Sequence, residues 1–289
     1  MVEIAVPEVD YTRYTNRQLV AVPLALLAVA LLVIVGWYVL TGAPANLGLE
    51  FTGGTELRMD VAGDNPRQQI DEAFTAEPVS VQQVAADGSF VATFGVGEVT
   101  TTELEREANS AGFDIRTIDS VSPSFGGDTQ RLAIGGVIAA FIGMSLLVFG
   151  MFRTFVPSLA IVASAFSDVM IPLAMMNLLG IDLTLGTVAA LLMLIGYSVD
   201  SDILLNNSIL RRSGDFYEST SRAMRTGVTM TITSIAAMAV MTVLAYIFGI
   251  QIMTAIGLIL VIGLLADLMN TYLLNVSLLR WYVHKGVKR

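Results

Sequence analysis

The sequence predicts a polytopic α-helical membrane protein with six transmembrane helices and one extracytoplasmic α+β domain between helices one and two. Three observations support this fold class. The chain is 54% hydrophobic and only 14% charged, a balance typical of membrane proteins. Its apolar residues fall in six runs, each long enough to cross a bilayer. One long polar stretch, residues 42–131, separates the first run from the other five.

The first apolar run, Leu19–Leu40, is predicted to be an uncleaved membrane anchor. It is too long for the core of a signal peptide and lacks a clear small-residue cleavage site. The other runs, of which the last is long enough to tilt or to continue past the membrane interface, are Leu132–Phe152, Val156–Leu179, Leu183–Leu205, Val228–Phe248 and Ile252–Leu279. Small residues such as Gly143 and Gly263 recur in the spans and favour close helix packing.

The chain therefore divides into five parts by composition. These are an N-terminal tail (1–18), a first transmembrane helix (19–41), the α+β domain (42–131), a five-helix transmembrane block (132–279) and a basic C-terminal tail (280–289).

The distribution of Arg and Lys predicts the orientation in the membrane. Eleven of the 16 lie in the two tails, at Arg153 or between the fourth and fifth spans, positions that share one face of a six-span topology. The connections near Ile181 and Ile250, on the other face, carry none. Because cytoplasmic loops carry the excess of positive charge, we expect a multi-pass cell-membrane protein with both termini cytoplasmic and residues 42–131 outside.

Residues 42–131 alternate between strand and helix patterns. Strands are predicted at Phe51–Val61, Val79–Ala85, Ser89–Val96 and Phe113–Val121, with an Asp87-Gly88 hairpin turn between the second and third. Helices are predicted at Pro66–Ala76 and Thr101–Ala111, the second opened by Thr101 or Thr102 with Glu105 in a capping box. The order strand-helix-strand-strand-helix-strand predicts a ferredoxin-like domain, an antiparallel sheet with two helices on one face.

Composition excludes several kinds of site. The chain has no cysteine, and its single histidine, His284, lies in the basic tail, so we expect no disulfide and no metal site. It has no GxxxxGK[ST] phosphate loop, and we expect no ATP hydrolysis, no cofactor and no enzymatic activity. The pair Arg211-Arg212 is interpreted as a cytoplasmic anchor at the membrane lipid and not as a nucleic-acid site.

The acidic charge is concentrated in one part of the chain. The net charge is −9, and fifteen of the 25 acidic residues lie in 42–131, whereas the only lysines are Lys285 and Lys288. An acidic, lysine-poor domain suggests adaptation to high salt, where screening weakens self-repulsion; an ordinary acidic surface is the alternative.

Four acidic residues lie inside the apolar runs: Asp168, Asp200, Asp202 and Asp267. A carboxylate in hydrocarbon costs several kcal/mol unless it is neutralised, paired or in contact with water, so such residues are candidates for function. We interpret Asp267, in a polar patch that also contains Asn270, Thr271 and Asn275, as structural.

Asp200 and Asp202 are separated by about 200° around a helix and cannot both face the same partner. Asp200 shares its face with Asn207, and Asp202 shares its face with Ser198 and Asn206. Both faces are polar, and the pattern leaves open which carboxylate lines a polar seam and which reaches the inner interface or a second subunit.

The functional hypothesis is that Asp200, Asp202 or Asp168 takes up and releases a proton or cation in a transport-like cycle. Asp200 is the first candidate, and Arg225 is a candidate counter-ion or otherwise a topology anchor. The alternative is structural, with the acids fixing helix packing through hydrogen bonds to Ser, Thr and Asn side chains.

Several motifs resemble those of the SecD/SecF family of protein-export membrane proteins. GLEFTGGTEL resembles the family signature G-[IL]-[DE]-F-[TR]-G-G-T, and the residues that match it are Gly48, Phe51, Thr52, Gly53, Gly54 and Thr55. The stretch Gly180–Leu205 resembles the fourth span of the family, and SDVMIPLAM around Asp168 resembles the third, with Ser167 in place of a common histidine. The layout is similar to that of the SecF half of the family, of archaeal, halophilic type.

The resemblance implies membership of the RND transporter superfamily and a complex with SecD. It also implies that the chain assists a translocating polypeptide at a SecYEG-type channel, with an ion gradient as energy source. Two departures bear on that mechanism: the acid of the bacterial SecF motif falls at Ser201, and an arginine of the bacterial fifth span falls at Thr229. Two alternatives stay open, a stand-alone RND-like small-molecule transporter and an assembly scaffold with no ion step.

Overall fold

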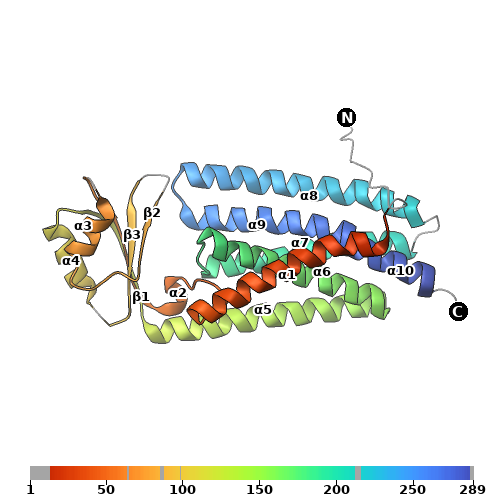
Figure 1. Ribbon diagram of the computed structural model, residues 1–289, viewed down its shortest axis with the longest axis horizontal. Helices are drawn as coiled ribbons and strands as arrows, with labels where there is room; N and C mark the ends of the chain where they lie inside the picture. The colour runs from red at the N-terminus through yellow and green to blue at the C-terminus, as the bar shows by residue number, and fades with distance from the viewer. Residues whose placement is uncertain (1–13, 64, 85–87, 98, 212–215, 287–289) are drawn as a thin grey trace.

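The computed structural model describes the chain over residues 14–63, 65–84, 88–97, 99–211 and 216–286. Within these residues six helices are long and apolar enough to cross a membrane. They are α1 (Asn16–Thr41), α5 (Pro123–Phe152), α6 (Phe155–Leu179), α7 (Leu185–Arg211), α8 (Phe216–Ile247) and α9 (Gln251–Met269), which continues through the π-helix η1 (Asn270–Asn275) into α10 (Val276–Gly286). Figure 1 shows these helices side by side in one block, with a small sheet at one end of it. The prediction of a polytopic membrane protein with a sheet domain is confirmed.

Several helices extend beyond the apolar runs that predicted them. The helix α5 begins at Pro123, because Ser122 accepts a hydrogen bond from the Phe125 N–H and proline suits the first helical position. The helix α8 likewise begins at Phe216, in a polar stretch. Hydropathy identifies only the part of a helix that contacts hydrocarbon. Backbone hydrogen bonds and capping allow the same helix to extend into neighbouring polar residues.

The sheet domain contains four antiparallel strands in the order β2-β3-β1-β4. Its elements are β1 (Gly54–Asp60), α3 (Pro66–Ala73), β2 (Ser80–Gln83), β3 (Phe90–Phe94), α4 (Thr101–Ser110) and β4 (Asp114–Val121). Figure 1 shows α3 and α4 on the side of the sheet that faces away from the membrane helices.

Two local predictions for this domain are wrong. Phe51 was placed in the first strand, but it lies in a short helix, α2 (Leu49–Thr52), that turns the chain into β1. The capping box of α4 is formed by Thr100 and Glu103, not by Thr101 or Thr102 with Glu105, since the Thr100 side chain accepts from the Glu103 N–H. Of the predicted hairpin turn, Asp87 lies outside the described residues and Gly88 has a φ of +74°.

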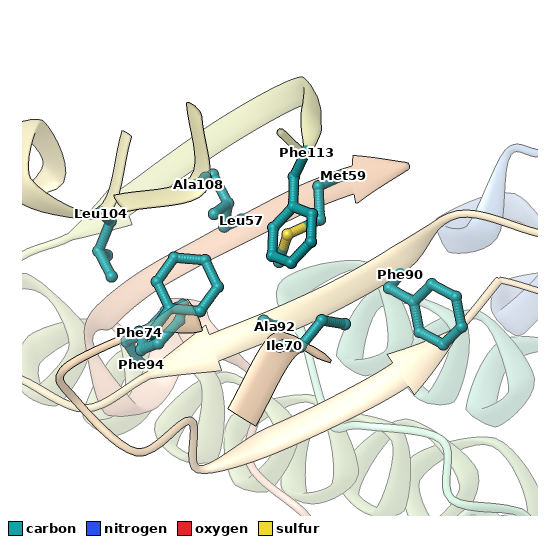
Figure 2. Close-up of a cluster of buried hydrophobic side chains, with 10 residues drawn as sticks. All are labelled: Leu57, Met59, Ile70, Phe74, Phe90, Ala92, Phe94, Leu104, Ala108 and Phe113. Atoms are coloured by element: carbon teal, nitrogen blue, oxygen red, sulfur yellow. The ribbon is translucent and has the colours of Figure 1, made fainter. Parts of the chain in front are cut away.

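Alternation along the strands builds the core of the sheet domain. Leu57 and Met59 of β1 are fully buried, while Glu56 and Arg58 point to the opposite face. Figure 2 shows the side chains that fill the space between the sheet and its two helices: Leu57, Met59, Ile70, Phe74, Phe90, Ala92, Phe94, Leu104, Ala108 and Phe113. The other face of the sheet is left toward the membrane helices (Figure 1).

Candidate functional site

Three buried carboxyl groups come together inside the membrane block. Asp168 on α6 and Asp202 on α7 are fully buried, and Asp267 on α9 is 1% exposed. The helices that carry them pack against one another. We call Asp168, Asp202, Asp267 and the side chains that hydrogen-bond to them the acid cluster.

Asp168 is held by two neutral groups on neighbouring helices. Its Oδ2 accepts a hydrogen bond from Ser198 of α7, and its Oδ1 accepts one from the Asn270 amide of η1. Asp168 therefore joins α6 to both of the other helices of the acid cluster.

Asp202 is only half satisfied. Its Oδ1 accepts from Thr271 Oγ1 at 2.9 Å and from Asn275 Nδ2 at 2.8 Å. Its Oδ2 is buried and has no hydrogen-bond partner among the described residues. The hydroxyl of Ser164, on α6, is near both Asp168 and Asp202 and is also without a partner in that set.

Asp267 is connected to Asp202 through shared hydroxyl groups. Ser201 Oγ lies 2.9 and 3.1 Å from the two carboxyl oxygens of Asp267, and Thr271 Oγ1 lies 3.3 Å from Oδ1. Because Thr271 also contacts Asp202, a single hydroxyl lies between two carboxyl groups. Ser201 thus belongs to the acid cluster as a hydroxyl.

The π-helix η1 supplies three of the five side chains that hydrogen-bond to these carboxyl groups. Asn270, Thr271 and Asn275 are all fully buried, and each contacts a carboxyl group of the acid cluster. A π-helix has a wider turn than an α-helix and is often found at functional sites. The wide turn directs Asn275 to the same side of the helix as Thr271, one turn earlier.

The two polar faces of α7 lie in different surroundings in the structure. Ser198 and Asn206 are buried in or beside the acid cluster, and Asn206 Nδ2 donates to the Asp202 carbonyl oxygen at 2.8 Å. Asp200 and Asn207 lie on the exposed face of α7. The question left open by the pattern is settled, because Asp202 lines the polar seam and Asp200 faces outward.

The structure also places Arg225 and Asp267, two other charged residues considered from the sequence. Arg225 lies on an exposed position of α8, a helix that contributes no residue to the acid cluster. Asp267, interpreted from sequence as lying in a polar patch with Asn270, Thr271 and Asn275, does lie with them, and the patch faces Asp168 and Asp202. Asp267, Thr271 and Asn275 follow one another at intervals of four residues, and this spacing was the sequence signal that they share one face of the helix.

The family-signature residues form the joint between the sheet domain and the membrane block. Gly48 is buried against the loop that connects α6 and α7, and its N–H donates to the Leu183 carbonyl oxygen at 2.8 Å. Gly54 has a φ of +122°, and a Cβ there would overlap the Phe94 carbonyl oxygen, so only glycine fits. Phe51 and Gly53 are buried, Thr52 is exposed, and Thr55 hydrogen-bonds across the sheet to Ser120 at 3.0 Å.

A pocket of about 430 Å³ lies between the sheet and the membrane helices. Glu56, Gln82 and Thr93 line it from the sheet. Asp182 lines it from the loop between α6 and α7, and Gln251 lines it from the first turn of α9. Burial raises the pKa of Glu56, and the nearby Asp119 and Asp182 raise it further. Burial also raises the pKa of Asp182, while its hydrogen bond with Gln82 acts in the opposite direction.

Comparisons with known proteins agree with this fold. The family "Protein export membrane protein SecD/SecF, C-terminal" matches residues 100–285, and "SecD/SecF GG Motif" matches residues 38–63. The crystal structure of SecDF, a translocon-associated membrane protein, from Thermus thermophilus has a TM-score of 0.73 and 21% sequence identity, and the match covers 98% of this chain. The chain spans 40% of the length of that protein, and the likeness shows a shared fold.

Several relatives named protein-export membrane protein SecF match all or most of the chain. The relative from Haloferax volcanii is 69% identical and that from Haloquadratum walsbyi is 64% identical, each over 100% of both chains. The relative from Pyrococcus furiosus is 37% identical over 93% of this chain and 92% of its own. On these matches, the chain belongs to the SecD/SecF family of protein-export membrane proteins.

Proposed function

We propose that the chain is an accessory subunit of the Sec translocon that acts with a SecD-type partner to assist polypeptide translocation, using an ion gradient through the acid cluster. Family membership supports the export role, because the relatives are named protein-export membrane proteins. The observation that carries the ion-coupling step is the convergence of three buried carboxyl groups on neutral Ser, Thr and Asn partners.

The charge of the acid cluster is the physical reason for this step. Three ionised carboxylates held in hydrocarbon by neutral groups would each keep a large desolvation cost and would repel one another. Uptake of a proton or cation removes part of that cost, and its release restores it. The side chains from α6, α7 and η1 then rearrange their hydrogen bonds, which changes the packing of the helices.

Asp202 is the residue we assign to the exchange of the ion. Its Oδ1 is fixed by Thr271 and Asn275, whereas its buried Oδ2 has no partner among the described residues. A proton on Oδ2 would neutralise the group without breaking either of those bonds. Asp168, with both oxygens hydrogen-bonded, is assigned to holding the helices together around it.

Asp200 is assigned a different role, contact with the SecD-type partner. It lies on the outer face of α7 together with Gly196 and Tyr197, about 22 Å from the start of the helix at Leu185. A carboxylate at that depth, facing away from its own helices, needs water or a polar partner. A second subunit packed against this face would supply the partner.

We further propose that the sheet domain is a ferredoxin-like domain on the extracytoplasmic side, within residues 42–131, and that both termini are cytoplasmic. The strand order β2-β3-β1-β4 and the two helices on one face support the domain type. The excess of Arg and Lys at the other end of the molecule supports the orientation. From there the domain could meet the polypeptide that leaves a SecYEG-type channel.

The substitution Asp202→Asn tests the ion step. We expect a chain that folds, reaches the membrane and co-purifies with its SecD-type partner, but slows export of a secreted reporter severalfold, because the neutral amide cannot exchange a proton. The matched control is Asp128→Asn, at an exposed position near the start of α5, which should export normally.

The outcomes of this test separate the competing functions. Normal export by Asp202→Asn, with only a change in thermal stability, would remove the ion step and leave the assembly-scaffold function. A purified homo-oligomer without any second family member would favour a small-molecule transporter. Loss of partner association in Asp200→Asn, but not in Asp202→Asn, is expected if α7 presents Asp200 to that partner.

A further inference from the structure

The segment before β1 is tied to the end of α6 and to the loop that leads into α7 by a series of hydrogen bonds. The Asn177 amide donates to the Pro44 carbonyl oxygen at 2.9 Å. The Leu183 N–H donates to the Asn46 carbonyl oxygen at 2.6 Å, and the Gly48 N–H returns a bond to the Leu183 carbonyl oxygen. Residues 44–50 and 177–185 therefore form one joint, although more than a hundred residues separate them in the chain.

The joint is closely packed around the glycines of the family signature, Gly48 and Gly53. A Cβ on Gly48 would lie 2.8 Å from Thr184 Cγ2 and 3.1 Å from the Leu183 carbonyl oxygen. A Cβ on Gly126, in the first turns of α5, would lie 2.9 Å from the Gly53 nitrogen. Beside the joint, the pocket of about 430 Å³ lies between the sheet and the membrane block.

Glu50 closes this joint on the first residue of α7. Its Oε2 accepts a hydrogen bond from the Leu185 N–H. The first N–H groups of a helix have no partner within the helix and carry partial positive charge, so a carboxylate is favoured there. Thr184 and Thr187 cap each other's N–H groups within the chain, whereas the Leu185 N–H is capped by a residue from the other side of the joint.

The helix α7 connects Glu50 to the acid cluster. Ser198, Ser201 and Asp202 lie on it, roughly 20–25 Å from its start at 1.5 Å per residue. On the other side of the joint, Glu50 is followed within a few residues by β1, the central strand that carries the sheet domain.

We propose that Glu50 is a positioning residue that fixes the outer end of α7 to the sheet domain, so that a displacement of α7 at the acid cluster moves the domain. This rests on the proposed function. The signature thereby has a mechanical role: its glycines allow close approach, and its acid binds the helix terminus. Without the Glu50 carboxylate, the remaining hydrogen bonds of the joint end at Leu183, before α7, and the domain would follow a displacement of α7 less closely.

Spin labels on the full-length chain in lipid nanodiscs test the proposal, and the sequence has no native cysteine to interfere. One label replaces Asn109 on α4 and the other replaces Ala189 on α7, both at exposed positions. Three backgrounds are compared: Glu50→Ala, Glu50→Gln, which keeps an acceptor oxygen, and Glu105→Ala on the exposed face of α4 as matched control. Hydrogen exchange of the α7 amides and export of a reporter are measured on the same variants.

We expect Glu50→Ala to broaden the distance distribution between the labels and to slow export, with Glu50→Gln and Glu105→Ala close to the parent. The rate of amide hydrogen exchange in the first turn of α7 should rise about fivefold in Glu50→Ala. This factor corresponds to the roughly 1 kcal/mol by which a capping side chain stabilises a helix. An unchanged distance distribution in Glu50→Ala would overturn the positioning role, whatever its effect on export or exchange. A broadened distribution with normal export would keep the positioning role and count against the proposed function.

Discussion

At the scale of single residues, burial decides which carboxyl groups matter. Asp200 and Asp202 belong to the same helix and are two positions apart, yet one faces outward and the other is fully buried. A rotation of about 200° between them is enough to change the surroundings from the outside of the protein to a seam between helices. The two side chains are chemically identical, but the free-energy cost of a charge is much larger at the buried Asp202 than at the exposed Asp200.

Glu56 offers a pH test at this scale, outside the membrane spans. Its pKa is raised above 4.5 in the folded chain, first by burial and then by Asp119 and Asp182. The folded state then binds more protons than the unfolded state above that pH, so stability falls as pH rises through the window that begins near 4.5. Glu56→Gln should raise the unfolding temperature of the sheet domain at neutral pH and weaken its dependence on pH.

The measurement is thermal unfolding of the full chain as a function of pH at constant salt. Glu105→Gln, at an exposed position of α4, is the control and should leave the curve unchanged. A Glu56→Gln variant that loses stability at neutral pH would contradict the sign given above.

At the scale of elements, the membrane block depends on where helices can approach closely. Gly263 of α9 lies against Leu194 of α7, so the two helices that carry Asp267 and Asp202 are in direct contact at this point. Around Gly143 of α5, no other part of the described chain comes within 4 Å of the position a Cβ would take, apart from the adjoining residues and backbone of its own helix. The prediction that small residues serve packing therefore holds for Gly263, and Gly143 faces open space in the isolated chain.

Gly263→Ala is expected to destabilise the membrane block by about 1–3 kcal/mol, because the added Cβ would overlap the buried Leu194 side chain. The same change at Gly143 should cost nothing or stabilise slightly, because alanine favours helix. Thermal unfolding in detergent of the two variants side by side makes the comparison. Equal stability of the two variants would show that α7 and α9 can separate at this point without cost.

At the scale of the whole molecule, the two ends of the helix block differ. The start of α1 and the end of α10 lie at the end opposite the sheet domain (Figure 1). The acidic residues concentrate in the sheet domain and the basic residues at the other end. This asymmetry supports the proposed orientation, with the sheet domain outside the cell.

Single cysteines can test the orientation in a chain that has none of its own. Asn109→Cys, on α4, should react with a membrane-impermeant maleimide in intact cells. Tyr14→Cys, exposed just before α1, should react only after the membrane is permeabilised. The reverse pattern would place the sheet domain in the cytoplasm and would exclude its proposed contact with an emerging polypeptide.

The six apolar spans, the sheet domain between the first two and the four acidic residues inside the spans could all be predicted from the amino-acid sequence. These features depend on composition and on periodicity along a single segment, which are local properties. The element order of the sheet domain was also predictable, although Phe51 and the α4 cap were placed wrongly, because a helical turn and a cap depend on one or two hydrogen bonds.

Which of the four acidic residues come together could not be predicted from the sequence, because it depends on how the helices pack. The rotation of α7 about its axis is set by its packing against α6 and α9, and that packing turned Asp202 inward and Asp200 outward. The π-turn that brings Asn275 to Asp202, and the bond from Leu185 to Glu50, likewise join parts of the chain that are far apart in sequence. Contacts of that kind depend on the relative position of whole helices, which no single segment specifies.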